Sequence, residues 1–149
     1  MSNPDLLALG IASFSAIISL IAVIITIIIY LLNRNLNRKL LAYQMLLEVN
    51  NATIEHPDIR INNEEKLKKF KENERILIDE RKTAYYSVAW NFVEGVYQLK
   101  LTKEEYLEPS LKSIIYDDFH YQWFKTNPEQ YSLDFIKYVK GIRTNKDKK

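Results

Sequence analysis

The sequence contains no cysteine, which excludes disulfide bonds and thiolate metal sites. It has only three glycines and four prolines among 149 residues, and this scarcity favours helices because all-β folds need many tight turns. Glycine-rich phosphate loops, nucleophile elbows and HExxH zinc motifs are also absent from it. We therefore expect an all-α protein that is not an enzyme and that holds no cofactor and no metal.

Charge of neither sign dominates the chain. Its 21 Lys and Arg residues and 19 Asp and Glu residues give a net charge of +2, and the two signs are interspersed. This pattern disfavours nucleic acid as a partner. By contrast, aromatic residues are plentiful, with ten Tyr, six Phe and two Trp, so that even a small domain can bury a large apolar area.

A long apolar stretch lies near the N-terminus, where no charged residue occurs from Leu6 to Leu32. As a helix it would be roughly 40 Å long, which exceeds a hydrocarbon core of about 30 Å. A signal peptide has a basic start and a small-residue cleavage site. This chain begins Met-Ser-Asn-Pro-Asp and stays bulky to Leu32. We therefore predict an uncleaved transmembrane anchor over residues 1–32.

The charges that flank the stretch predict its orientation. Only Asp5 precedes it, whereas Arg34, Arg38 and Lys39 follow it. Because basic residues stay on the cytoplasmic side, the N-terminus is expected outside and the larger C-terminal part in the cytoplasm, at the inner (plasma) membrane. The three basic residues are expected to contact anionic lipid headgroups, each contributing about 1 kcal/mol.

Small and hydroxyl-bearing residues form a heptad stripe along this predicted helix, at spacings of four and three. The stripe consists of Ala8, Ala12, Ser15, Ser19, Ala22 and Thr26. In lipid, such residues let helices approach closely. The stripe is either an interface with a second copy or another protein, or ordinary filler of a membrane helix.

Helical spacing of apolar residues continues beyond the anchor. We expect the helix to continue, or to restart, through about Val49 and to stop before His56, because Pro57 disfavours helix at the preceding residue. A loop is expected over residues 50–63.

A second amphipathic region is expected to form the centre of the cytoplasmic part. After a charged segment capped by Asn62 or Asn63, with Glu64 and Glu65 in its first turn, the pattern becomes apolar from Ile76. Two apolar stripes lie side by side, one made of Tyr85, Val88, Ala89, Phe92, Val96 and Leu99 and the other of Tyr86, Trp90, Val93 and Tyr97. A helix that is apolar over most of its circumference is typical of a bundle core.

The C-terminal third is expected to form the remaining helices. Thr102 and Glu105 form a capping box, and Pro109 should either kink that helix or open a second one. Asn127-Pro128 is expected to start the last helix and Gly141 to end it. The predicted organisation is an anchor over 1–32, a bundle of about four helices over 33–142, and a basic disordered tail over 143–149.

Four polar residues form a candidate site, namely Asn91, Glu94, Asp117 and His120. Asp117, His120 and Glu94 are chemically suitable metal ligands, but such residues are common by chance on a charged helix. We favour a buried polar contact in which His120, on the same helical face as Asp117, bonds Glu94 or Asn91 on the core helix.

Three segments carry a resemblance to a family. They are His56-Pro57-Asp58-Ile59-Arg60, the aromatic run from Trp90 to Tyr97, and the run from His120 to Trp123. In these segments the chain resembles a family of small bacterial single-pass membrane proteins to which no activity is assigned. The resemblance implies a cytoplasmic helical domain on a membrane anchor and implies nothing about mechanism.

Two functions follow as expectations. The first is a non-enzymatic interaction or regulatory module at the membrane, which binds an unidentified protein partner or a ligand and self-associates through its transmembrane helix. The alternative is a membrane effector, like those of toxin or phage-defence systems, that perturbs the bilayer by self-association; this rests on analogy.

Overall fold

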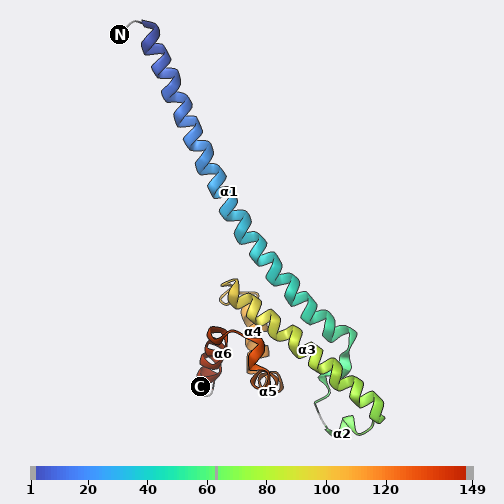
Figure 1. Ribbon diagram of the computed structural model, residues 1–149. Coiled ribbons are helices and arrows are strands. Elements are labelled where there is room, and N and C mark those ends of the chain that lie inside the picture. Colours follow the sequence, from blue (N-terminus) through green and yellow to red (C-terminus); the bar gives the residue numbers. More distant parts are fainter. Residues whose placement is uncertain (1–2, 63, 147–149) are drawn as a thin grey trace. The chain divides into compact units, whose positions relative to one another are not determined.

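The chain is helical throughout the part that the computed structural model describes, which is residues 3–62 and 64–146, with side chains over 11–62 and 64–144. No strand occurs in that part, so the predicted all-α class is confirmed. Its elements are α1 (Asn3–Glu55), the 3-10 helix η1 (Pro57–Arg60), α2 (Glu64–Leu67), α3 (Glu72–Gln98), α4 (Glu108–Tyr116), α5 (Asp118–Thr126), the 3-10 helix η2 (Pro128–Gln130) and α6 (Leu133–Lys146) (Figure 1).

The chain divides into two compact units, Met1–Lys39 and Leu40–Lys149. This boundary falls a few residues after the predicted end of the anchor at residue 32. Helix α1 supplies residues to both units, and it runs without interruption to Glu55. The predicted continuation through Val49 and the stop before His56 are therefore confirmed. The loop expected over residues 50–63 is wrong for most of its length, because residues 50–55 belong to α1 and Pro57–Arg60 form η1.

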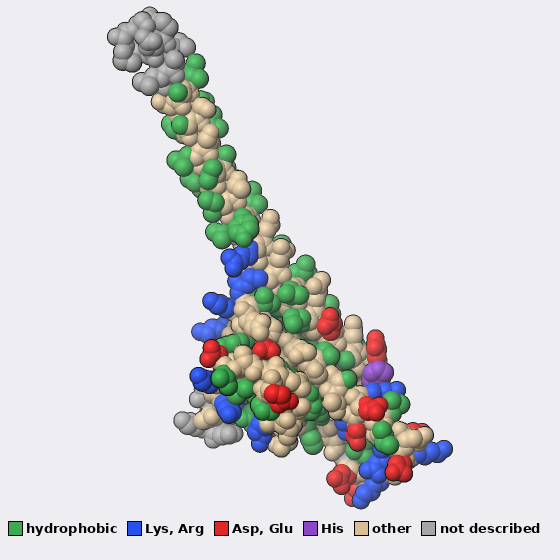
Figure 2. Space-filling model, in the orientation of Figure 1, with side chains coloured by type: hydrophobic (Ala, Val, Ile, Leu, Met, Phe, Trp, Pro, Cys, Tyr) green, Lys and Arg blue, Asp and Glu red, His purple; other side chains and the backbone are tan. Residues whose placement is uncertain are grey.

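The first unit is an apolar helix. Among the described helices, α1 alone is long and apolar enough to cross a membrane, with a mean hydropathy of 2.9 over its most apolar window and none of that window buried. Figure 2 shows hydrophobic side chains along this stretch, followed by Lys and Arg side chains.

The second unit is a helical bundle centred on α3, as predicted. Helix α3 contacts η1, α4 and α5, and α4 also contacts α6. The fully buried Trp90 ring stacks on Phe124 with ring centroids 4.3 Å apart, and Phe135 meets both rings edge-on. The core draws on every long helix of this unit, namely Ala42, Val49, Ala89, Trp90, Phe92, Val93, Val96, Leu101, Leu107, Leu111, Ile114, Ile115, Phe124, Tyr131, Phe135 and Val139.

The predicted capping box at Thr102 is wrong. Helix α3 ends in a turn in which Lys100 adopts a left-handed φ of 58° and Leu101 N–H donates to Val96 O at 3.0 Å. The turns that follow bury Leu101 and Leu107, and α4 begins only at Glu108. The second alternative for Pro109 is confirmed, because it lies in the first turn of α4.

The last helix also differs from prediction. Asn127-Pro128 opens only the short η2, and α6 begins at Leu133, where the Ser132 hydroxyl accepts a hydrogen bond from Phe135 N–H at 3.3 Å. Gly141 does not end α6, which continues to Lys146. A helix tolerates one internal glycine when packing on either side holds it.

The predicted disordered tail is wrong for its first residues. Residues 143–146 belong to α6, and Arg143 is anchored to the bundle. Residues 147–149 lie outside the described part of the chain.

The charged segment over residues 64–75 is divided between two helices, α2 and the first turn of α3. Glu64 and Glu65 occupy the first turn of α2, as predicted, but α2 ends at Leu67. Helix α3 then starts afresh, where the Glu74 carboxylate accepts a hydrogen bond from Lys71 N–H at 2.9 Å. Of the two predicted caps, Asn63 lies outside the described residues, and no capping hydrogen bond of Asn62 is present in the described part.

Candidate functional site

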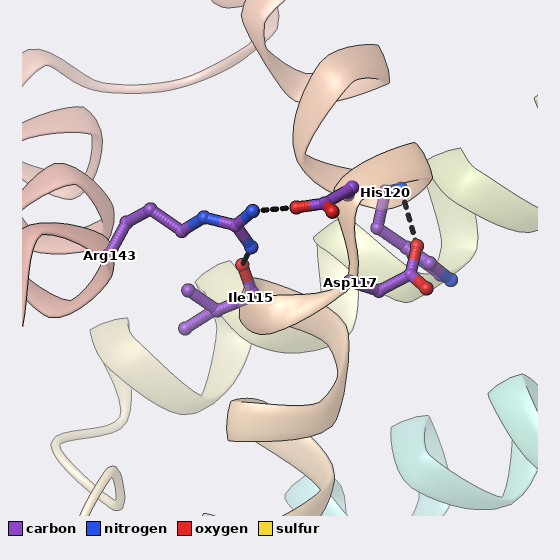
Figure 3. Close-up of polar contacts among 5 residues, drawn as sticks. Ile115, Asp117, His120 and Arg143 are labelled. Atoms are coloured by element: carbon purple, nitrogen blue, oxygen red, sulfur yellow. Dashed lines mark hydrogen bonds and ion pairs between the residues drawn. The ribbon is translucent and has the colours of Figure 1, made fainter. Parts of the chain in front are cut away.

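Asp117 separates α4 from α5 and sets the position of His120. Its backbone is extended (φ −72°, ψ 131°), so α4 ends at Tyr116 and a new helix starts at Asp118. The Asp117 carboxylate caps α5 by accepting a hydrogen bond from His120 N–H at 2.9 Å (Figure 3). Asp117 and His120 therefore do meet, as an N-cap and the third residue of its helix.

The imidazole of His120 is buried against two tyrosine rings. Its ring lies edge-on to Tyr85 and Tyr86, with centroids 5.2 and 4.7 Å away. The residue is 9% exposed, and its Nδ1 has no hydrogen-bond partner among the residues that the structure describes. The backbone of the same residue is fixed from α3, because the Trp90 indole N–H donates to His120 O at 2.9 Å.

Burial controls the protonation of this cluster. It lowers the pKa of His120 below the usual 6.5, and the nearby Asp117 carboxylate offsets this only in part. Burial raises the pKa of Tyr86 to about 12, with a further contribution from Asp117. The pKa of Tyr85 is also raised, mainly by burial. At neutral pH the imidazole is therefore uncharged and both phenols keep their protons.

The segment around η1 closes the cluster on its other side. Arg81 of α3 pairs with Asp58 at 3.0 Å, and Lys82 donates to Ile61 O at 2.6 Å. Ile59 is buried beneath them. These contacts hold η1 against α3 and place Arg60 next to Tyr85, whose pKa its charge lowers slightly.

A cavity of about 140 Å³ lies among these groups, lined by Ile59, Arg60, Asn62, Tyr85, Tyr86, Asp117 and His120. Its walls carry one guanidinium and one carboxylate, together with phenol, amide and imidazole groups. Such a set suits a small polar ligand that both accepts and donates hydrogen bonds. Two of the segments that carry the family resemblance, the one at His56–Arg60 and the one that starts at His120, both contribute to this cavity.

The predicted contact of His120 with Asn91 or Glu94 is wrong. Asn91 is exposed, and neither residue bonds His120 in the described structure. Glu94 lies instead near Tyr131, where its charge adds to burial in raising the pKa of that phenol. The prediction assumed that Asp117 and His120 lie on one continuous helix. Asp117 is instead the extended N-cap of α5, and His120 lies in the first turn of that helix. No group of three or more His, Asp or Glu side chains in the described part is arranged to hold a metal.

The heptad stripe lies on α1, with Ala12, Ser15, Ser19, Ala22 and Thr26 all exposed. Ala8 is within the helix, but its side chain lies outside those that the structure describes. Thr26 Oγ1 donates to Ala22 O at 2.8 Å, so its proton is used within the helix. Among the basic residues, Arg34 is exposed, whereas Arg38 and Lys39 are half-buried. Neither the stripe as an interface nor the headgroup contacts are tested, and both stay predictions.

Sequence reasoning missed Arg143, which joins α6 to the start of α5. Its Nη1 donates to Ile115 O at 2.9 Å, its other nitrogen pairs with Asp118, and its guanidinium lies 4.8 Å from the Tyr121 ring centroid (Figure 3). It also missed Arg60 and the Tyr85–Tyr86 pair as lining groups. The sequence did contain a signal for Arg60 in the His56–Arg60 motif. There Asp58 and Arg60 flank Ile59, which is buried.

Comparison with protein families, with curated proteins and with solved structures found no match to this chain. The family resemblance described above therefore remains a prediction.

Proposed function

We propose that this chain is a non-enzymatic, single-pass membrane protein that holds a ligand- or partner-binding helical bundle at the cytoplasmic face of the inner membrane. The observation that carries the proposal is the apolar part of α1. From Ile11 to Leu32 every side chain is exposed, and no charged residue interrupts the run. A core helix of a soluble protein would bury one face, whereas lipid solvates an apolar helix on all sides.

The orientation rests on charge. Arg34, Arg38 and Lys39 follow the apolar run, and this excess of basic residues supports a cytoplasmic bundle. Cys-free composition agrees with that compartment. The recognition role rests on the cavity beside His120, whose lining combines opposite charges with a buried imidazole nitrogen that has no partner in the described part of the chain.

Single-cysteine labelling tests the anchor and its orientation, since the chain has no native cysteine to interfere. In intact cells a membrane-impermeant maleimide should label Ser2→Cys and should label Glu80→Cys only after lysis. The reverse pattern would overturn the orientation. Release of the full-length protein from membranes by alkaline carbonate would overturn the anchoring itself.

Affinity capture of the full-length protein from native membranes tests the recognition role. Arg60 and Lys137 are both exposed basic residues of the second unit, so Lys137→Ala is a matched control for Arg60→Ala. A protein captured by the wild type and by Lys137→Ala, but not by Arg60→Ala, would support recognition at the cavity. If overexpression instead collapses the membrane potential and no partner is captured, the interaction role is wrong and a membrane effector takes its place.

A further inference from the structure

An apolar face of α1 is left uncovered within the second unit. Leu40, Leu47 and Ile54 are 54%, 58% and 74% exposed, although they lie on a helix whose opposite face is buried in the bundle. We call these three residues the exposed heptad face.

The spacing of the exposed heptad face is that of a coiled coil. Its members are seven residues apart, and Tyr43 and Asn50 occupy the intervening positions at three residues after each leucine. From Leu40 toward the N-terminus, spacings of four and three residues continue to alternate. They pass through Leu36 and Asn33 and reach Thr26, the last residue of the heptad stripe. An uninterrupted helix that keeps a 3.5-residue repeat supercoils with a partner helix.

The distribution of charge favours a like helix as the partner, because it leaves self-pairing free of like-charge repulsion. Between residues 33 and 55 the charged residues are Arg34, Arg38, Lys39, Glu48 and Glu55. None of them occupies a position of the repeat, which reads Asn33, Leu36, Leu40, Tyr43, Leu47, Asn50 and Ile54. Parallel self-pairing brings identical residues together, so a charged residue in the repeat would repel its own copy. Asparagine, by contrast, is self-complementary because its amide both donates and accepts.

From these observations we propose that a second copy of this chain packs in parallel, in register, against the exposed heptad face. Tyr43 is half-buried against the bundle core, which places it at the border of the interface rather than at its centre. The parallel arrangement rests on the proposed anchoring, because two copies inserted in one membrane in the same orientation present this face in the same direction. Two heptads are marginal alone, and confinement to the membrane raises the effective concentration.

Disulfide cross-linking of the full-length protein in native membranes tests the pairing with matched neighbours. The yield from Leu40→Cys is compared with that from the control Leu41→Cys, an adjacent leucine of similar exposure (48%) that lies off the repeat. The yield from Leu47→Cys is compared in the same way with that from Glu48→Cys. On oxidation the two repeat positions should give homotypic dimers at about ten times the yield of their neighbours. Equal yields, or no dimer at either repeat position, would overturn the proposal. Cross-links between Leu40→Cys and Ile54→Cys in mixed samples, without homotypic ones, would overturn the parallel register.

A charge placed on the face gives a second test. Leu47→Glu in the Leu40→Cys background should reduce dimer yield about tenfold, whereas Leu41→Glu should leave it unchanged. Both leucines are exposed, so neither change disturbs the bundle core. Equal yields in the two variants would contradict pairing through this face. Carbonate extraction of the same membranes reports on anchoring separately, so a protein that stays in the membrane without cross-linking disproves only the pairing.

Discussion

Two stretches of α1 contain similar apolar residues but differ in what surrounds them. Over 11–32 the side chains are exposed all round, with Phe14 at 66% and Leu32 at 65%. Over 40–55 the helix is divided, because Ala42 and Val49 are buried at 0% and 5% while other apolar side chains remain exposed. Apolar content alone therefore does not decide burial. A stretch that is apolar on every side calls for an apolar solvent, whereas a stretch with polar residues at intervals packs one face on its own domain.

The largest expected contrast comes from truncating one phenylalanine in each unit. Phe135→Ala removes a fully buried ring in contact with Trp90 and Phe124, which should lower the free energy of unfolding of the bundle by about 3–5 kcal/mol. Phe14→Ala should change it by less than about 0.5 kcal/mol. Urea unfolding of the full-length protein in detergent micelles, followed by near-UV circular dichroism, measures both. A similar loss in the two variants would mean that the first stretch is packed on protein.

The divided stretch is tested by introducing a carboxylate on each of its faces. Ala42→Glu buries an unpaired charge and should destabilise the bundle by about 3 kcal/mol or more. Gln44→Glu, on an exposed position two residues later, should shift the unfolding free energy by less than about 0.5 kcal/mol. The same unfolding experiment reports both changes. If Ala42→Glu is tolerated, residues 40–55 do not pack into the bundle core as described.

A smaller effect is expected where the last helix is tied to the bundle. Arg143→Met should cost about 1–2 kcal/mol, because it leaves Ile115 O without its donor and removes the guanidinium from the Tyr121 ring. Asp118 is 80% exposed, so that ion pair contributes little. Lys137→Met breaks an exposed pair with Asp134 and should cost at most about 0.5 kcal/mol. Hydrogen exchange of the α6 amides distinguishes the two variants. Equal protection of these amides in Arg143→Met and Lys137→Met would show that Arg143 does not anchor this helix.

The most gradual effect is a pH dependence from His120, whose pKa is lowered in the folded state. Above about 6.5 both states hold the neutral imidazole. As the pH falls below that value, only the unfolded state binds the proton, so the folded state loses stability by at most about 1.4 kcal/mol per pH unit, down to the folded pKa. Urea unfolding between pH 7.5 and 5 should show this slope in the wild type and a shallower one in His120→Gln. Parallel slopes would show that His120 is freely protonated in the folded protein.

The sequence predicted best where a pattern persists over many residues. The apolar run of α1, its stop before His56 and the central role of α3 all followed from periodicity or from one proline. Predictions failed where a few residues compete for the same local hydrogen bonds. Thr102 could cap a helix, but burial of Leu101 and Leu107 sets the chain path there. Asp117 looked like a helical residue, whereas its extended backbone makes it a cap. The cavity beside His120 could not be predicted, because Arg60 and Asp117 are brought together only by tertiary packing.

The buried core spans most of the chain, from Ala42 to Val139, and this span has a consequence for biosynthesis. The apolar stretch precedes the bundle in the sequence, so under the proposed anchoring it can engage the insertion machinery before Phe135 and Val139 are synthesised. At about 5–20 residues per second, the interval between Ala42 and Val139 lasts roughly 5–20 s. During that time Ala42, Val49 and the aromatic face of α3 have no final partners. Under the proposed anchoring, insertion therefore precedes completion of the domain, and a nascent chain released early would display that face to chaperones and proteases.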